Sequence, residues 1–444
     1  MTKSPEKEPK SSFDGRTTTW SITTYFAEGL PFMIVRFMSS VFFTDIGMRE
    51  AHLGFLNFLG IPWNLKFLWA PVLDIFGTKK GWLIKVQFLI GIFVFLIAIL
   101  ASMMPEDKES ILFGISFLNK EGISFLIVLL FVALAFLSAT HDVAIDAYYL
   151  EALPSEREQS LYSGIRVMAY RVAIIYSKSF LVIMAGVSGW FWGFGVGALT
   201  MLALFFFHLV YLKPTEKKDH GINGNKKEKL KKSLLVYLDA FRSYMAQDKA
   251  ILVLVFIIMY KLGDEIMFSM NTPFLLREIG MTKAQLGWVS GIVGTICAIG
   301  GSLWGGKWIS SWGLKRAIWP MTIIMNITIL AYALLAWVKP DPMTNSGLAL
   351  ITFINGYEQI AAGLGTAVLI VFLMNKCQAD YKASHYAIGS AIMSLGGTIM
   401  GGFGGVFVEQ FGYMNLFLFG FLASVPSMVM IFWVPLGRVD GSST

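Results

Sequence analysis

The stretch Asp45-Ile-Gly-Met-Arg-Glu-Ala-His-Leu-Gly54 occurs twice in this chain of 444 residues. Its second copy is Glu278-Ile-Gly-Met-Thr-Lys-Ala-Gln-Leu-Gly287, which lies 233 positions further on and is identical at six of the ten positions. Each copy separates the first apolar segment of its half of the chain from the second. A motif that returns at the same place in two successive halves indicates two copies of one structural unit.

A second pair of matching stretches follows the first. Asp74-Ile-Phe-Gly-Thr-Lys-Lys80 matches Ser310-Ser-Trp-Gly-Leu-Lys-Arg316 at an offset of 236. The two pairs fall before and after the second helix of each half, and two parallel six-helix units are typical of the major facilitator fold. We therefore predict an all-α membrane protein with twelve transmembrane helices in two six-helix halves.

The composition also indicates a membrane protein. The chain is 55% hydrophobic and only 15% charged, whereas soluble domains carry roughly 25% charged residues. The two cysteines, Cys297 and Cys377, show neither a disulfide framework nor metal-ligand spacing, so we expect no metal and no cofactor. The net charge of +7 comes from basic residues that cluster in loops, which indicates membrane topology and not a nucleic-acid partner.

Apolar segments divide the chain into five regions. We expect a cytoplasmic N-terminal tail (1–17), a six-helix half (18–212), a basic linker (213–248), a second six-helix half (249–436) and a C-terminal tail (437–444). The predicted helices are 18–43, 51–73, 82–103, 123–150, 161–186, 190–212, 249–277, 285–309, 316–338, 348–375, 384–410 and 413–435.

Lysine and arginine are concentrated in the loops on one side of this topology. With the N-terminus inside, most of them fall in cytoplasmic segments, which places both termini in the cytoplasm. The polar N-terminal tail lacks the apolar core of a cleaved signal, so the first helix is expected to direct insertion. The basic linker is best interpreted as a solvated topology determinant, with lipid or partner binding as the alternative.

The segment Ser138–Glu158 carries two carboxylates in an apolar helix. Asp142 and Asp146 are four residues apart and therefore share one face. If the helix leaves the membrane near Glu151, Asp142 lies about 14 Å inside at ~1.5 Å per residue, close to the middle of a ~30 Å hydrocarbon core. Acids at that depth are costly and mark a substrate or proton pathway, so both are candidates for proton coupling.

The turns that follow the second helix of each half are candidate gating elements. A glycine permits the tight turn, and the acid and the basic residues can hold one conformation by bonding to neighbouring helices. The alternative is a plain cytoplasmic turn with positive-inside charge. The residues concerned are Asp74, Gly77, Lys79, Lys80, Gly313, Lys315 and Arg316.

Several stretches together resemble the muropeptide permease (AmpG) family of the major facilitator superfamily. They extend nearly from end to end of the chain: Gly60–Asp74, Lys79–Trp82, His141-Asp142, Asp146-Ala147, Leu153-Pro154, Tyr170-Arg171, Tyr260–Asp264, Leu303–Gly306, Glu358–Thr366 and Phe407–Glu409. The resemblance implies a multi-pass importer of anhydro-muropeptides in the bacterial inner membrane, driven by protons and serving cell-wall recycling. It also marks Tyr170 as a candidate substrate contact.

Two residues depart from that family pattern, Glu28 and Arg166. They are an extra acid and an extra base in the first half, and they indicate either a private ion pair or an altered substrate. We therefore keep Glu28 among the candidate coupling acids and Arg166 among the candidate substrate contacts.

Further charges inside predicted helices complete the candidate set. Lys66 lies roughly 12 Å from the end of its helix and is expected to bind a substrate carboxylate or an aspartate, with snorkelling as the alternative. Arg171 and Lys178 share a face and could bind an anionic substrate or form structural ion pairs. Spacing lets Lys261 pair with Asp264 or Glu265, and Asp264 is a candidate substrate or coupling residue. Glu358, in the tenth helix, is a further candidate coupling acid.

These observations leave three hypotheses about function. The first is proton-coupled import of anhydro-muropeptides, acting as a monomer. The second is the same mechanism with another anionic solute, such as acetyl-CoA or a nucleotide-like compound. The third, less favoured, is a membrane sensor that does not transport. An enzyme is not expected, because no nucleophile–base set appears in the sequence.

Overall fold

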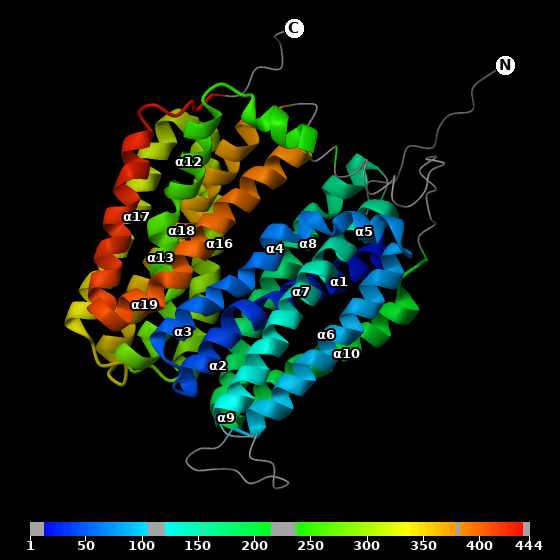
Figure 1. Ribbon diagram of the computed structural model, residues 1–444, viewed down its shortest axis with the longest axis horizontal. Helices are drawn as coiled ribbons and strands as arrows, with labels where there is room; N and C mark the ends of the chain where they lie inside the picture. The colour runs from blue at the N-terminus through cyan, green and yellow to red at the C-terminus, as the bar shows by residue number, and fades with distance from the viewer. Residues whose placement is uncertain are drawn as a thin grey trace, which may run out of the picture.

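The computed structural model describes residues 13–104, 120–153, 155–214, 235, 238–378 and 382–437. Within these residues the regular secondary structure is entirely helical, which confirms the predicted fold class. The helices form two bundles side by side (Figure 1). We call the helices before residue 214 the N-terminal bundle and those after residue 249 the C-terminal bundle.

The N-terminal bundle contains six successive helical segments. The first three are α1 (Gly15–Met33) with the π-helical turn η1 (Ile34–Met38) and α2 (Ser39–Asp45); then α3 (Glu50–Phe55), η2 (Leu56–Gly60), α4 (Ile61–Leu65), η3 (Lys66–Leu68) and α5 (Ala70–Ile75); then α6 (Lys79–Ser102). The others are α7 (Lys120–Ala152); α8 (Glu156–Ile175) with the π-helical turn η4 (Tyr176–Leu181) and α9 (Val182–Ser188); and α10 (Trp190–Tyr211).

The C-terminal bundle repeats this order. It begins with α12 (Ala250–Tyr260), α13 (Leu262–Ser269), α14 (Asn271–Pro273) and the π-helical turn η5 (Phe274–Glu278). It continues with α15 (Lys283–Leu286), the π-helical turn η6 (Gly287–Val293), α16 (Gly294–Trp312), α17 (Leu314–Val338), α18 (Asn345–Asn375) and α19 (Lys382–Met430).

Nine helical stretches among the described residues are long and apolar enough to cross a membrane. The longest, α19, contains a break at Gly412, where φ is 78°, so that it supplies two arms. Segments 50–75 and 250–278 are interrupted and fall outside the nine. The arrangement is consistent with the twelve predicted helices, but these two segments are not the continuous helices that the sequence predicts.

Proline accounts for the interruptions of segment 50–75. Pro62 and Pro71 lie in the first turns of α4 and α5, where the missing N–H of proline is tolerated. Each proline also removes a hydrogen bond to the preceding turn, so the helix before it cannot continue unbroken. In the C-terminal bundle, the backbone instead leaves helical geometry at Lys261, with φ of −105°, and again at Met270. Both breaks lie deep inside otherwise apolar segments.

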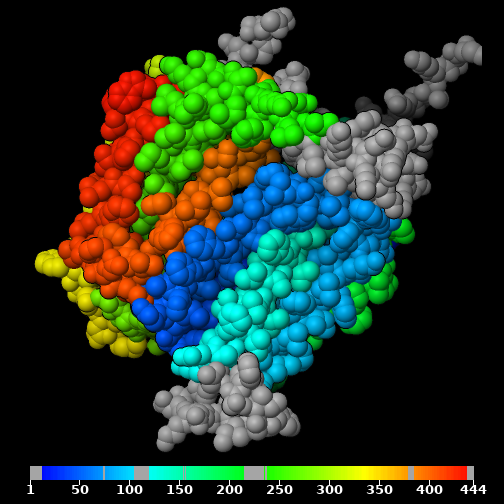
Figure 2. All heavy atoms as spheres, viewed as in Figure 1, coloured from blue at the N-terminus to red at the C-terminus, as the bar shows by residue number. Residues whose placement is uncertain are grey.

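The bundles meet most closely at the end that carries residues 44–50 and 277–283, which we call the closed end. There α3 packs on α19, α2 on α14, and α9 on α15, and Figure 2 shows the orange atoms of α19 meeting the blue atoms of α3 and α4. A Cβ on Gly405 would lie 1.8 Å from the carbonyl oxygen of Glu50, so this crossing requires glycine. The opposite end, where α1 begins beside the end of α10, we call the terminal end.

Ion pairs reinforce the closed end. Arg277 Nη1 lies 2.8 Å from Glu50 Oε1, and Lys283 Nζ lies 2.6 Å from Asp45 Oδ2. Arg277 also donates two hydrogen bonds to the carbonyl oxygen of Thr44. The two copies of the repeated stretch therefore face each other across the boundary between the bundles.

Candidate functional site

Five predicted residues gather inside the N-terminal bundle and form what we call the acid–base network: Glu28, Lys66, Asp142, Asp146 and Arg166. Lys66 Nζ forms an ion pair with Asp142 Oδ2. Arg166 Nη2 donates to Asp146 Oδ1 at 2.8 Å. Glu28 lies close enough to Asp142 and Asp146 to interact electrostatically with both. The network thus links α1, η3, α7 and α8.

Local structure explains how these side chains meet. Lys66 stands at the break between α4 and α5, which brings the lysine against α7. The guanidinium of Arg166 lies 4.3 Å from the ring centres of both Tyr25 and Tyr149, and Tyr25 Oη donates to the same Asp146 oxygen at 2.8 Å. The surroundings therefore fix Arg166 by stacking as well as by charge.

A cavity of about 310 Å³ lies between the two bundles. The N-terminal bundle lines it with Arg36, Arg171 and Lys178. The C-terminal bundle contributes Glu265, whose carboxylate interacts with Arg36 across the cavity. We call this space the central cavity.

Two of its cations are carried by π-helical turns. Arg36 belongs to η1 and Lys178 to η4, and two further π-helical turns, η5 and η6, contribute Leu275 and Ser290 to the lining. An extra residue in a helical turn widens it and redirects the side chain, and such turns are frequent at functional sites.

The predicted residues of the C-terminal bundle lie behind the cavity wall. Lys261 Nζ is 3.2 Å from Asp264 Oδ2, so the lysine pairs with Asp264 and leaves Glu265 to the cavity. Glu358 is fully buried and accepts a hydrogen bond from Gln359, which does line the cavity. These three residues are thus near the cavity but do not border it.

Among the N-terminal candidates, Arg171 and Lys178 border the central cavity, whereas Tyr170 packs against Phe32, with ring centres 6.2 Å apart. The acid–base network does not border the cavity either. The roles of all these residues in transport remain predictions.

Sequence reasoning named Glu265 only as a possible partner of Lys261, and it missed Arg36 and the neutral cavity residues Asn271, Ser290 and Asn355 as site residues. Arg36 had a usable signal, since it is a lone charge inside the first apolar segment. The neutral residues carry no such signal, because serine and asparagine are common in transmembrane helices for packing reasons.

The candidate gating turns have the expected backbone. Gly77 and Gly313 have φ of 80° and 73°, a region that favours glycine. Lys79 donates to the carbonyl of Leu73, and Lys80 to those of Leu209 and Leu212. Lys315 and Arg316 are exposed. The side chain of Asp74 lies outside the described residues, and the gating role stays a prediction.

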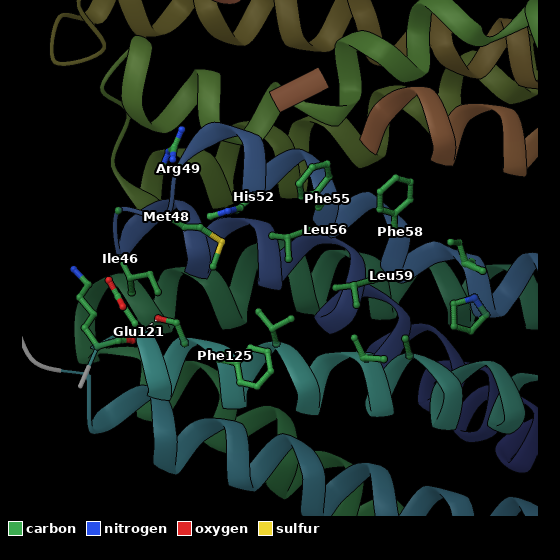
Figure 3. A pocket seen from close by; sticks show the side chains of 18 of the residues that line it. Ile46, Met48, Arg49, His52, Phe55, Leu56, Phe58, Leu59, Glu121 and Phe125 are labelled. Carbon is green, nitrogen blue, oxygen red and sulfur yellow. Dashed lines mark hydrogen bonds between the residues drawn. The ribbon is translucent and has the colours of Figure 1, made fainter. Parts of the chain in front are cut away.

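A larger cavity, of about 860 Å³, lies within the N-terminal bundle between the segment 46–62 and α7 (Figure 3). Its body is apolar, with Leu56, Leu59 and Phe125 lying between the two elements, and the few charged side chains, such as Arg49 and Glu121, stand at one end. Phe125 is 63% exposed. This groove faces outward from the bundle and is not the space between the bundles.

The comparison with family models gives the class of the protein. The model of the Major Facilitator Superfamily matches residues 21–362 and again 263–443. The chain belongs to the Major Facilitator Superfamily. This confirms the fold predicted from the repeat.

Individual relatives narrow the resemblance. The chain is 27% identical over 415 residues to the anhydromuropeptide permease of Escherichia coli (strain K12), which covers 91% of this chain and 77% of that protein. It is 23% identical over 417 residues to a Rickettsia felis chain named as an AmpG transporter, covering 91% and 93%. The resemblance to the muropeptide permease family is thereby confirmed, and the family and these relatives are transporters.

Solved structures show the same fold. The nucleoside transporter NupG has a TM-score of 0.63 at 16% identity, covering 95% of this chain and 100% of that one. A bacterial homolog of the human lysosomal transporter Spinster, in an inward-facing and occupied conformation, has a TM-score of 0.64 at 13% identity, covering 94% of both.

Proposed function

We propose that this protein imports anhydromuropeptides across the bacterial inner membrane by proton-coupled alternating access. The observation that carries the proposal is the central cavity, which lies between two bundles of a transporter fold and presents Arg171 and Lys178 to a solute. The identity of the proposed solute comes from the similarity to the anhydromuropeptide permease, which extends over 91% of this chain. Free peptide carboxylates of such a solute suit a cationic wall.

The closed end suits the outer side of the membrane. The ion pairs Arg277–Glu50, Lys283–Asp45 and Arg49–Glu409 join the bundles there, and the basic turns at Lys79 and Lys315 lie at the terminal end, which positive-inside bias assigns to the cytoplasm. Rocking the bundles about the cavity then exposes it to each side in turn. We expect the monomer to suffice, because each chain contains both bundles.

The acid–base network supports coupling to one proton. It contains three acids (Glu28, Asp142 and Asp146) against two bases (Lys66 and Arg166). A proton on one of the three acids makes the network neutral. Release of the proton leaves an uncompensated charge in an apolar bundle, which favours rearrangement. Glu358 is the candidate coupling acid of the other bundle.

Coupling can be tested in membrane vesicles with labelled anhydromuropeptide. Asp142→Asn is expected to abolish the stimulation of uptake by a pH gradient, lowering gradient-driven uptake by about tenfold or more, while exchange of solute without a gradient continues. Asp239→Asn, at an exposed position outside the bundles, is the matched control and should behave as the unmodified protein. Uptake that ignores a protonophore, or full stimulation in Asp142→Asn, would show that the network does not couple transport to protons.

The cationic wall also fits other multiply charged anions, so acetyl-CoA or a nucleotide-like solute is the second candidate. Thermal stabilisation of the purified protein separates the two. We expect anhydromuropeptide to raise the unfolding temperature and CoA esters to leave it unchanged. The reverse ranking would replace the muropeptide by a nucleotide-like solute.

A further inference from the structure

The two walls of the central cavity differ in chemistry. All of its basic side chains, Arg36, Arg171 and Lys178, come from the N-terminal bundle. Arg36 donates to the carbonyl oxygen of Asn57 at 2.7 Å and faces Glu265. Among the described residues, Arg171 and Lys178 have no carboxylate within ion-pair distance, and Lys178 Nζ lies over the ring of Phe37 at 4.6 Å. Two cations thus border the cavity without a carboxylate in ion-pair contact, and the charge that acts on Lys178 is that of the buried Glu358.

The wall from the C-terminal bundle is polar but almost uncharged. Asn271, Ser290 and Asn355 border the cavity and are 8%, 6% and 1% exposed. Asn271 Oδ1, Ser290 Oγ and Asn355 Oδ1 have no hydrogen-bond partner among the described residues. Gln359, Thr295 and Ser269 line the same wall.

Unpartnered buried polar atoms are rare, and several at one cavity surface indicate a ligand that supplies the missing bonds. Hydroxyl and amide groups can donate to the oxygens of Asn271 and Asn355, whereas a carboxylate cannot; the Ser290 hydroxyl can both donate and accept. Conversely, the side chains of Arg171 and Lys178 can only donate hydrogen bonds, and a carboxylate can accept them. The two walls therefore call for two different parts of one solute.

We infer that the central cavity holds its solute in a fixed orientation, with an anionic carboxylate-bearing part on Arg171 and Lys178 and a neutral part rich in hydroxyl and amide groups on Asn271, Ser290 and Asn355. The inference rests on the proposed function and deepens it. In an anhydromuropeptide the peptide carboxylates meet the N-terminal bundle and the N-acetylated sugar meets the C-terminal bundle. The solute then bridges the two bodies that must move relative to each other.

The test compares two solutes with the purified full-length protein: an anhydromuropeptide that keeps its peptide, and the same anhydro-sugar without the peptide. Binding is measured by calorimetry for Arg171→Gln, Lys178→Met, Ser290→Ala and Asn355→Ala. The cation variants should weaken the peptide-bearing solute by about tenfold more than the peptide-free one. The Ser290 and Asn355 variants should weaken both by the same factor.

Conservative variants keep the test decisive if a charge removal perturbs folding. Lys178→Arg retains the cation and should keep the preference for the peptide-bearing solute, and the unfolding temperature of every variant is recorded. If the unmodified protein binds both solutes but the cation variants weaken both equally, the orientation is wrong while the proposed function stands. If the unmodified protein binds neither, the proposed function itself is wrong, and the orientation with it.

Discussion

Arg166 shows how one residue that departs from the family pattern is accommodated. Its guanidinium lies between the rings of Tyr25 and Tyr149 and donates to Asp146 at 2.8 Å. Arg166 thus pairs with Asp146, and no ion pair joins it to Glu28, the other departing residue, among the described residues. A planar, weakly hydrated cation suits such a place better than lysine, because it stacks on aromatic faces while it donates to the acid.

The pair is expected to contribute measurably to stability. In a double-mutant cycle with Arg166→Met and Asp146→Asn, we expect a coupling free energy of about 1–2 kcal/mol, discounted for partial exposure of the acid. Thermal unfolding of the purified variants measures it. The exposed pair Arg242–Asp239, whose atoms are 3.7 Å apart, is the control and should give less than about 0.5 kcal/mol. Equal coupling in the two pairs would contradict the argument.

At the residue scale, the usable signal in the sequence was a charge deep inside an apolar segment. That rule found Asp142, Asp146 and Lys66, but it carries no distances, so the pairing of Lys66 with Asp142 remained one of several alternatives until the structure placed them. Spacing alone left Lys261 with two acids to choose from. The break at Lys261, with φ of −105°, ends the regular helix at that residue, and the lysine pairs with Asp264.

At the scale of elements, the interrupted segments contribute most to the site. The break that carries Lys66 and the π-helical turns that carry Arg36 and Lys178 place charges where a regular helix would not. Proline signals part of this from the sequence, as at Pro62 and Pro71. A π-helical turn has no comparable signal, because it depends on how neighbouring helices pack.

The crossing of α3 and α19 provides an element-scale prediction. Gly405→Ala would place a Cβ 1.8 Å from a backbone oxygen of Glu50, so the closed end cannot close as observed. We expect this variant to disfavour the closed arrangement by about 1–3 kcal/mol and to lower uptake accordingly. Reaction of Ser40→Cys, a cavity-lining position, with an impermeant thiol reagent added from the closed end should become faster.

The matched control is Gly306→Ala, since a Cβ there meets nothing within 4 Å. It should change neither uptake nor thiol reactivity. If both alanine variants behave alike, close approach of the backbones is not what the closed end requires.

At the scale of the whole molecule, the charges divide between the two ends. Four described cations of the closed end are each matched by an acid: Arg49 by Glu409, Arg277 by Glu50, Lys283 by Asp45 and Lys339 by Glu278. At the terminal end, Lys80 donates instead to the backbone carbonyls of Leu209 and Leu212. The all-helical membrane fold could be predicted because apolar length and the repeat are properties of the chain alone, whereas the cavity depends on how the bundles meet.

The predicted orientation can be checked with reporter fusions. Alkaline phosphatase folds only outside the cytoplasm. Fused after Thr444, it should therefore be inactive. Inserted between Asp341 and Met343, in the loop that joins α17 to α18, it should be active. A fluorescent protein that needs the cytoplasm should give the opposite pattern at both sites. Activity of the phosphatase after Thr444 would invert the proposed orientation.

The pairing at the closed end also bears on how such a chain arose. In the alignment of the two copies, Lys283 corresponds to Glu50, and Arg277 to Thr44. Asp45 of the first copy pairs with Lys283 of the second, while Glu50 of the first pairs with Arg277 of the second. Positions 44–45 of each copy thus contact position 50 of the other, which is the reciprocal pattern of a two-fold symmetric dimer interface. The closed end therefore has, within one chain, the pattern of contacts by which two copies of a six-helix subunit would form a symmetric pair.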